Sequence, residues 1–399
     1  MRNGPVACVM GEVDLVRTLA LVGVRSGVIV EPGSPARYSR SVVEALDKVD
    51  PATDPEGAVE QLLGFARKQS EPPVLFYDGD WDLLLVSRYR DRLAEAFRFV
   101  IPDAELVEDL VDKARYQAFA DRLGIPVPPA RQITGSEPLP DDLGLRFPLV
   151  AKPLTRHHDT WRPFAMTKAR HVETPEELRE LHAAMAGSDI EVLIQEVIPG
   201  PEDRVVSYHC YVDQAGEIVG EFTDRKLRTY PKVYGYSTAI EITDVPKIRD
   251  LGRELTHRMG LRPGVAKFDF KEEPNGNLIL LEVNPRFNLV HHPGALAGVN
   301  LPALVYADLV GLPRPAASFR RHGVTWCNPA HDYQAAREWD IEPLRWAKLV
   351  LSSNAYSGFA WDDPLPLPRA VMWRIGRRLR RPTAPRTPVD ADPTVSDTA

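Results

Sequence analysis

Residues 267–286 read Lys-Phe-Asp-Phe-Lys-Glu-Glu-Pro-Asn-Gly-Asn-Leu-Ile-Leu-Leu-Glu-Val-Asn-Pro-Arg, and this stretch constrains the fold more than any other. Two apolar-rich runs, 265–270 and 278–283, flank a polar segment that contains Asn275-Gly276. An Asn-Gly pair between two such runs is a strong signal for a tight turn. The stretch is therefore predicted to form a β-hairpin.

Three oxygen-bearing side chains are predicted to meet on one face of this hairpin. A turn at Asn275-Gly276 places Asp269 opposite Glu282, and Glu282 and Asn284 point to the same side of their strand. Mg²⁺ takes a few such oxygens and completes its shell with phosphate and water. The alternative is a solvated hairpin face with ordinary charges. The apolar neighbours of each acid weigh against that alternative, because they are expected to pack on the opposite face.

The composition of the 399-residue chain, 44% hydrophobic and 26% charged, is typical of a soluble globular protein with two or three domains. A net charge of −7 and an isoelectric point near 5.9 argue against nucleic acid as a partner. Cys8, Cys210 and Cys327 are widely scattered, which favours a reducing, cytoplasmic location. We expect no signal peptide and no transmembrane segment, because no apolar run is long enough.

Residues 1–107 are predicted to form a small parallel α/β domain, because strand and helix patterns alternate there. The Asp78-Gly-Asp-Trp81 turn follows a strand, and ligands bind at the carboxyl ends of strands in open α/β sheets. Gly11-Glu-Val-Asp14 lacks the glycine fingerprint of a dinucleotide site. The strands are expected at 5–10, 27–31 and 74–78, and the helices at 14–22 and 55–68.

The next segment is predicted to carry one lysine on a buried strand. A helix is expected over 108–123, with Gly124 as its stop. In the strand 147–153, Lys152 follows an apolar run. Burial of a charged lysine in that position costs free energy unless an anion binds it. The strand 190–200 then ends at a Pro-Gly break.

A second hairpin is predicted from strands at 204–213 and 217–224, followed by a basic segment at 225–231. If that segment stays extended, Lys226 and Arg228 share a face and offer charge to a phosphate or a carboxylate. The alternative is a solvated basic strand.

Taken in order, these features resemble the ATP-grasp superfamily, and most closely its carboxylate–amine ligase branch. The similarity rests on the spacing of 13 residues from Asp269 to Glu282, on the Asn284-Pro-Arg286 that follows, and on the strand lysine and the Pro-Gly break before them. It covers about residues 108–311 strongly and the preceding domain weakly.

The resemblance implies an α/β fold class, with α+β character in the ATP-grasp part, where two subdomains clamp a nucleotide between their sheets. The expected domains are a Rossmann-like domain at 1–107, ATP-grasp subdomains at 108–193 and 194–313, an extension at 314–381 and a disordered tail at 382–399.

The resemblance also implies roles for individual residues. Asp269, Glu282 and Asn284 would hold Mg²⁺, for which Mn²⁺ can substitute. Arg286 would serve the transferring phosphoryl group and the oxyanion, with Lys226 and Arg228 as further catalytic residues. The implied ATP-binding residues are Lys113, Lys152, Lys168, Gln195, Glu196, Val197, Ile198, Glu202, Asp203 and Lys226.

Within this set, Lys152 would contact the α and β phosphates, and the main chain at 196–198 would bind adenine. Either Glu202 or Asp203 would take the ribose hydroxyls. The loop 154–168 departs from the family pattern because it contains no glycine. Its charged residues would then take the place of backbone amides as phosphate donors, namely Arg156, Arg162 and Lys168.

The implied activity is ATP- and Mg-dependent joining of a small carboxylate to an amine through an acyl phosphate, with release of ADP and phosphate. A small-molecule kinase, a carboxylase and a non-catalytic ATP-binding regulator are the alternatives. The oligomeric state stays open, with a homodimer as one arrangement. The basic segment 369–381 is expected either to pack its apolar face on the protein or to contact an anionic membrane surface.

Overall fold

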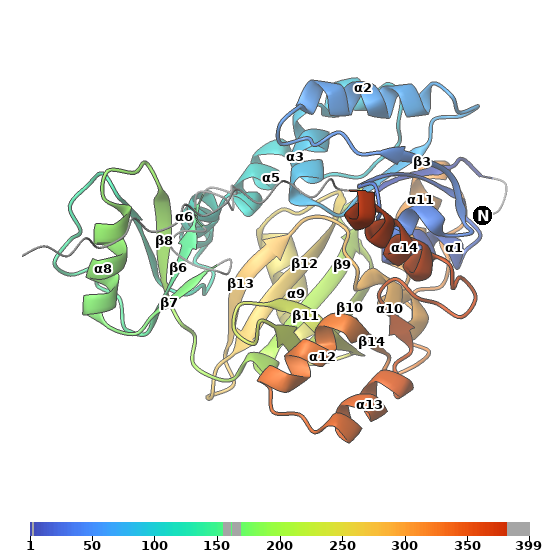
Figure 1. Cartoon of the computed structure of the whole chain (residues 1–399). Helices are drawn as coiled ribbons and strands as arrows, with labels where there is room; N and C mark the ends of the chain where they lie inside the picture. The colour runs from blue at the N-terminus through green and yellow to red at the C-terminus, as the bar shows by residue number, and fades with distance from the viewer. Residues whose placement is uncertain (2–3, 155–160, 162–168, 381–399) are drawn as a thin grey trace, which may run out of the picture.

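The computed structural model describes residue 1, residues 4–154, residue 161 and residues 169–380. Three sheets organise this part of the chain (Figure 1). A four-stranded sheet belongs to the amino-terminal domain, a second four-stranded sheet stands apart at one end, and a seven-stranded sheet lies between them. The predicted α/β class is confirmed.

The amino-terminal sheet has the order β3-β2-β1-β4 and is parallel throughout, as predicted. Its strands are β1 (Ala7–Met10), β2 (Ser26–Val30), β3 (Val42–Asp47) and β4 (Val74–Tyr77). Its helices are α1 (Val13–Ala20), η1 (Pro35–Tyr38), α2 (Pro55–Ala66), α3 (Asp80–Arg88) and α4 (Arg90–Ala94). The edge strand β3 was missed in the sequence, and none of its residues is fully buried.

The helix predicted over 108–123 is wrong, because the chain forms two helices there, α5 (Ala104–Val111) and α6 (Lys113–Leu123). Asp112 separates them with an extended backbone and accepts hydrogen bonds of 2.9 Å from the amides of residues 114 and 115. An aspartate in this position is a strong N-cap. Gly124 ends α6 in the left-handed conformation, as predicted.

The second four-stranded sheet, which we call the small sheet, is antiparallel and has the order β5-β8-β6-β7. One face packs on α8 (Pro175–Met185) through an apolar core that includes Leu149, Leu181 and Ile194. Its strands are β5 (Ala130–Thr134), β6 (Leu149–Pro153), β7 (Arg170–Val172) and β8 (Glu191–Glu196).

The seven-stranded sheet, which we call the large sheet, has the order β13-β12-β9-β10-β11-β14-β15. One face is apolar and packs on α9 (Pro246–Arg258), with Tyr208 and Phe268 in that core. The strands are β9 (Val205–Val212), β10 (Ile218–Tyr230), β11 (Tyr236–Thr243), β12 (Gly264–Glu272), β13 (Leu278–Asn284), β14 (Thr325–Cys327) and β15 (Ala355–Tyr356).

The predicted β-hairpin is confirmed as β12 and β13, and we call it the metal hairpin after the ligands predicted on it. Asp269 pairs with Glu282, and Lys267 pairs with Asn284. Gly276 lies in the turn with φ +87°, a conformation that glycine adopts without strain. An irregularity in the register follows Asp269, on the turn side of the acids, so the pairing of the two acids is undisturbed.

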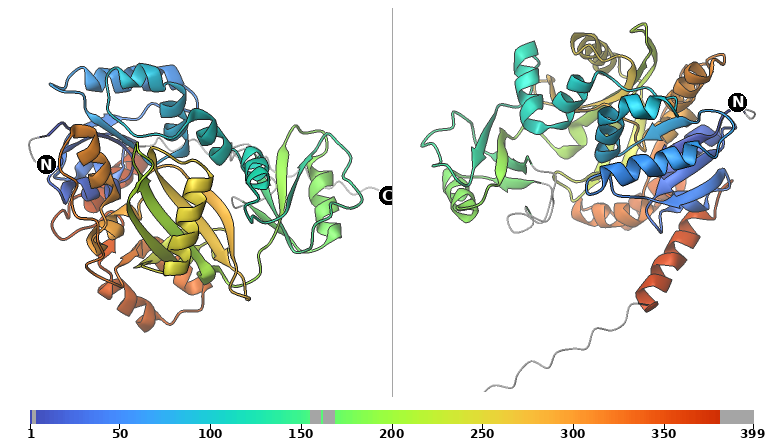
Figure 2. Two further views of the ribbon diagram at one scale, coloured as in Figure 1. Left: turned by 180° about the vertical axis from the view of Figure 1, so that it is seen from behind. Right: turned by 90° about the horizontal axis from the view of Figure 1, so that it is seen from above.

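The extension after residue 313 joins the large sheet, because β14 pairs antiparallel with β11 and β15 pairs parallel with β14. It also contributes α12 (Pro329–Glu338), α13 (Pro343–Ser352) and α14 (Pro366–Arg380). In Figure 2, α14 leads away from the body of the molecule.

The helix α14 packs on the amino-terminal domain by only part of its surface. A Cβ atom added at Gly33 would lie 2.3 Å from the Trp373 ring, so this glycine permits the contact. Ala370 is buried as well, whereas Met372 and Ile375 are 62% and 52% exposed. Of the apolar face that was predicted to pack on the protein, Trp373 makes such a contact, whereas Val371, Met372 and Ile375 are exposed.

Asp14 connects three distant parts of the chain. Its Oδ1 accepts a hydrogen bond of 3.2 Å from the Trp326 indole and lies 3.2 Å from Nδ1 of His292. The partners belong to β14 and to α10 (His291–Ala297), which is followed by α11 (Leu301–Val310). This one buried carboxylate ties α1 to the extension.

The three cysteines are all buried and unbonded. Within the described ranges no single helix is long and apolar enough to span a membrane, although α10 and α11, which meet at a 90° bend, pass that test as a pair.

Candidate active site

Asp269 lies on the polar face of the large sheet and is almost fully buried. Its Oδ1 accepts a hydrogen bond of 2.6 Å from Ser207, and its Oδ2 accepts one of 2.9 Å from Lys267. Burial alone would raise the pKa of Asp269, but the ammonium groups of Lys267 and Lys226 hold that pKa well below its ordinary value. The carboxylate is therefore ionised, and its remaining lone pairs can serve a cation.

Glu282, Asn284 and Arg286 form a chain of hydrogen bonds along the end of β13. The Asn284 amide donates to Glu282 over 3.1 Å, and Arg286 donates to the Asn284 oxygen over 3.2 Å. Arg286 also donates to Asp80 of the amino-terminal domain over 2.6 Å. Burial lowers the pKa of Arg286, but the negative charges of Asp80, Asp78 and Glu282 together raise it above its ordinary value. The predicted same-face arrangement of Glu282 and Asn284 is confirmed.

The predicted Asp78–Trp81 turn lies at the carboxyl end of β4, beside Arg286. Asp78 accepts a hydrogen bond of 2.7 Å from the Glu12 amide. Burial, more than any other cause, raises the pKa of Asp78 to about 7. This edge of the amino-terminal sheet therefore presents acidic groups to the end of the metal hairpin.

Lys152 on β6 has a neutral partner, because its ammonium donates to the Gln195 amide oxygen over 2.7 Å. Burial lowers the pKa of Lys152, and the negative charge of Glu282 opposes that shift. Glu282 therefore acts on a lysine of the small sheet across the space between the two sheets. Lys113, at the start of α6, donates to the Pro153 carbonyl at the end of the same strand.

The hinge between the two sheets follows β8. The Glu196 carboxylate is held by Arg146, which donates from Nη2 over 2.9 Å and from Nε over 3.1 Å. The amide of Val197 donates to the Pro148 carbonyl over 3.1 Å. The main chain at 196–198 is the segment predicted to bind adenine. Within it, the amide of Ile198 donates no hydrogen bond to any of the described residues.

The two candidate ribose acids face different neighbours. Glu202 accepts a hydrogen bond of 2.9 Å from Lys271 on β12, the first strand of the metal hairpin. Asp203 instead lines a cavity beside β10 together with Lys226. Glu202 thus contacts the metal hairpin itself, whereas Asp203 lies at the cavity beside β10.

Arg228 offers no unmatched charge to a substrate, contrary to our expectation from the sequence. It forms a buried two-pronged ion pair with Asp332 of α12, at 2.9 and 2.5 Å. Thr238 also donates to Asp332, over 2.8 Å. The ladder between β10 and β11 is irregular on both sides of Arg228, so the simple alternation with Lys226 is lost. Lys168, Arg156 and Arg162 lie outside the described residues.

No protein-family model matches the chain. A curated D-aspartate ligase from Enterococcus faecium is 26% identical over 292 residues, which cover 69% of this chain and 68% of the relative. An L-amino acid ligase structure from Bacillus licheniformis superposes with a TM-score of 0.58 at 14% identity, covering 79% of this chain and 76% of that one. An N5-carboxyaminoimidazole ribonucleotide synthetase in complex with ADP gives a TM-score of 0.64 at 13% identity, covering 95% and 98%.

The chain has the ATP-grasp fold. Its resemblance is to the carboxylate–amine ligase branch, as the sequence predicted.

Several polar residues of this ATP-grasp site were missed in the sequence. Ser207 and Lys267 contact Asp269 directly, and Lys267 had a detectable signal because it stands two positions before Asp269 on the same strand face. His209 pairs with Lys267 across β9 and β12 and is fully buried, with its Nε2 at 2.6 Å from Asp224. Burial lowers the pKa of His209, and Asp224 opposes that shift. Nothing in the local sequence marks His209, because its partner comes from the neighbouring strand.

The residues present fit a divalent cation of the kind that ATP-grasp enzymes use with ATP. Among the described residues no group of three His, Cys, Asp or Glu side chains is arranged around a metal, so the donor set is mixed. It consists of the ionised Asp269, the exposed Glu282 and the Asn284 amide. Mg²⁺ prefers hard oxygen ligands of this kind, and it takes only a few of them from the protein.

Proposed function

We propose that this ATP-grasp protein joins a carboxylate to an amine through an acyl phosphate, with release of ADP and phosphate. The observation that carries the proposal is the electrostatic link between Lys152 on the small sheet and Glu282 on the metal hairpin. It supports the action of a phosphate-type lysine of the small sheet and an acidic residue of the metal hairpin on one bound nucleotide. That arrangement suits a nucleotide triphosphate held between cation and metal.

In the proposed reaction, a carboxylate oxygen of the substrate attacks the γ-phosphorus of ATP, and ADP leaves. Lys152 offers its charge to the α and β phosphates, and Lys113 stands near the same strand end. Mg²⁺ bound by Asp269, Glu282 and Asn284 would neutralise phosphate charge. Positioning and charge neutralisation are what phosphoryl transfer requires.

In the second step the amine attacks the acyl carbon, phosphate leaves, and the amine loses a proton to the medium. A fixed guanidinium is suited to the oxyanion that develops on the acyl group. We assign this role to Arg286, because its position is fixed by Asp80 and Asn284. Lys226 serves the transferring phosphoryl group, whereas Arg228 is not carried forward because Asp332 neutralises it.

The nucleotide base is assigned to the hinge, with the main chain of residues 196–198 and Gln195 beside it. We assign the ribose to Glu202, because it lies over β12 on the side of the metal hairpin. Lys168 stays in the proposed ATP-binding set on the family resemblance alone. The name of the Enterococcus relative supports an amino acid as the carboxylate substrate.

The test is to incubate the protein with Mg-ATP and pools of amino acids and other small carboxylates, with hydroxylamine in place of the amine. We expect ADP, and a hydroxamate of the activated acid identified by mass spectrometry. Glu282→Gln serves as the control for contaminating activity. AMP and pyrophosphate would indicate adenylation and overturn the proposal, and a stable phosphoester without an amine requirement would indicate a kinase.

A further inference from the structure

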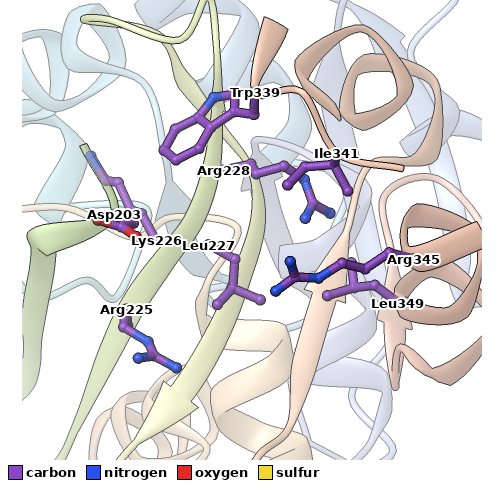
Figure 3. A pocket seen from close by; sticks show the side chains of 9 residues that line it. All are labelled: Asp203, Arg225, Lys226, Leu227, Arg228, Trp339, Ile341, Arg345 and Leu349. Carbon is purple, nitrogen blue, oxygen red and sulfur yellow. The ribbon is translucent and has the colours of Figure 1, made fainter. Parts of the chain in front are cut away.

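A cavity of about 310 Å³ lies between β10 of the large sheet and the helices of the carboxyl-terminal extension. Figure 3 shows the strand residues Arg225 to Arg228 on one side and Ile341, Arg345 and Leu349 on the other. Arg345 and Leu349 belong to α13. The extension therefore forms one wall of a cavity whose other wall is part of the ATP-grasp sheet.

Two of the four cations around this cavity are already matched. Arg225 donates to Glu241 over 2.6 Å, and Arg228 is bound by the buried Asp332. The side chains of the other two, Lys226 and Arg345, have no hydrogen bond or ion pair with any residue that the structure describes, and the same is true of the Asp203 side chain. The unmatched charges are thus two positive and one negative.

This charge set is complementary to an α-amino acid. A carboxylate can bind between a lysine and an arginine, whose charge-assisted hydrogen bonds are the strong ones. The single carboxylate of Asp203 can accept from an α-ammonium group. The surplus positive charge disfavours a purely cationic amine.

The rest of the lining is apolar and comes from Leu227, Trp339, Ile341 and Leu349. The Trp339 indole is fixed in place, because its Nε1 donates to the Thr229 carbonyl over 3.2 Å. An apolar wall with a few convergent polar groups is the usual character of a small-molecule site. Such a wall favours an aliphatic or aromatic side chain over a charged one.

The cavity is connected to the metal hairpin through β10. Lys226 lines the cavity and stands two positions after Asp224 on that strand, and Ser207 donates hydrogen bonds to both Asp224, over 3.3 Å, and Asp269, over 2.6 Å. A carboxylate held by Lys226 would therefore face the end of the cleft where the γ-phosphate is proposed to lie.

We propose that this cavity binds the carboxylate substrate, and that this substrate is an α-amino acid with an apolar side chain. The inference rests on the proposed function for its chemistry, but binding to the cavity can be measured without turnover. In it, Arg345 and Lys226 hold the carboxylate, Asp203 holds the ammonium group, and Trp339 contacts the side chain.

The binding test uses saturation-transfer NMR with leucine, methionine, phenylalanine and aspartate, each as L and D forms, in the presence of Mg-ADP. We expect the apolar amino acids to bind wild-type protein, and Arg345→Gln to weaken them by about tenfold, the scale of one charge-assisted hydrogen bond. Lys348→Gln is the matched control, because Lys348 is exposed on the same helix and does not line the cavity. Equal binding by Arg345→Gln and wild type would overturn the proposal, as would binding of aspartate alone.

A second variant tests the shape of the cavity. Leu349→Trp should exclude phenylalanine before it excludes smaller side chains, whereas a site elsewhere would leave the preference unchanged and contradict the proposal.

Steady-state kinetics then separates the proposed amino acid site from the proposed ligase function. A raised KM for the amino acid in Arg345→Gln, with an unchanged KM for ATP, supports the cavity as the substrate site, whereas a raised KM for ATP makes it a nucleotide subsite and overturns the proposal. Apolar amino acids that bind wild type and lose affinity in Arg345→Gln, but give no ADP or hydroxamate, would support the cavity and reject the ligase function.

Discussion

Arg286 and Asp80 are 206 residues apart in the chain and are joined by a hydrogen-bonded ion pair of 2.6 Å. The pair links the end of the metal hairpin to the first residue of α3 in the amino-terminal domain. Because Arg286 also binds Asn284, a change at Asp80 reaches a predicted metal ligand through one intervening side chain. The orientation of the amino-terminal domain is thereby coupled to the proposed catalytic centre.

Asp80→Asn should lower kcat about tenfold or more while leaving ATP affinity close to wild type. The amide keeps the shape of the side chain but removes the charge that orients the buried guanidinium. Isothermal titration with ADP and steady-state kinetics measure the two quantities. Asp91→Asn, on the neighbouring α4 and exposed, is the control. An unchanged kcat would show that the ion pair is only structural.

Glu282→Gln should abolish turnover and leave the fold intact, because a carboxylate ligand is lost from an exposed position in the cleft. Turnover at saturating ATP and millimolar Mg²⁺ is compared with the circular dichroism melting curve. Glu273→Gln, in the turn of the same hairpin, should behave like wild type. Wild-type rates in Glu282→Gln would remove this residue from the metal site.

Lys152→Met should weaken nucleotide binding by about 2–3 kcal/mol, the scale of a lost charge-assisted hydrogen bond. Burial lowers the pKa of Lys152, so its ammonium group is lost at a lower pH than that of an ordinary lysine. ATP affinity should therefore fall as pH rises through this lowered pKa, and Lys152→Arg should remove that part of the pH dependence because arginine stays charged. Titration calorimetry across alkaline pH measures both effects, and an identical pH profile for wild type and Lys152→Arg would contradict the assignment.

Arg228→Met should destabilise the protein by about 3–5 kcal/mol, because it leaves the Asp332 carboxylate buried and without its cation. Urea unfolding measures the loss. The double variant Arg228→Met/Asp332→Leu should recover part of it, since no charge is then left unpaired. A stable Arg228→Met protein without turnover would instead restore the catalytic role that the sequence suggested.

The exposed apolar side chains of α14, with the arginines around them, predict binding to anionic membrane surfaces. Met372 and Ile375 face solvent, and Arg374 and Arg377 are exposed nearby. We expect flotation with vesicles that contain phosphatidylserine, and loss of flotation in salt and in Met372→Ser/Ile375→Ser. Neither residue contributes to the buried contact of Trp373 with Gly33, so the variant should melt like wild type. Flotation that survives the double substitution would place the binding elsewhere.

The sequence predicted those features whose causes are local. The facing positions of Asp269 and Glu282 follow from a turn signal and strand parity, and both lie within one hairpin. The break at Asp112 was missed, because helical composition continues across it and only the cap hydrogen bonds reveal it.

The sequence did not predict which residues the charged side chains pair with when the partner belongs to a distant segment of the chain. Arg228 looked like a substrate-binding residue, and its pairing with Asp332 spans 104 positions through an extension with no recognisable pattern. The cavity beside β10 was missed for the same reason, because one of its walls consists of α13 and its neighbours. The sequence pattern predicts which face of a strand or helix a residue occupies. The residues that it contacts on that face are known only from the folded structure.

The hydrogen bond between Asp14 and Trp326 has a consequence for how the protein is made. A ribosome releases α1 first, and 312 further residues must be added before the indole that binds Asp14 exists. During that interval the carboxylate lacks a partner that it has in the finished protein, although the four strands of the amino-terminal sheet are already available to pair. The amino-terminal domain therefore completes its contacts only after the extension has been synthesised, because Gly33 meets Trp373 of α14 later still. A chain that stops short of β14 leaves α1 without the indole that binds Asp14.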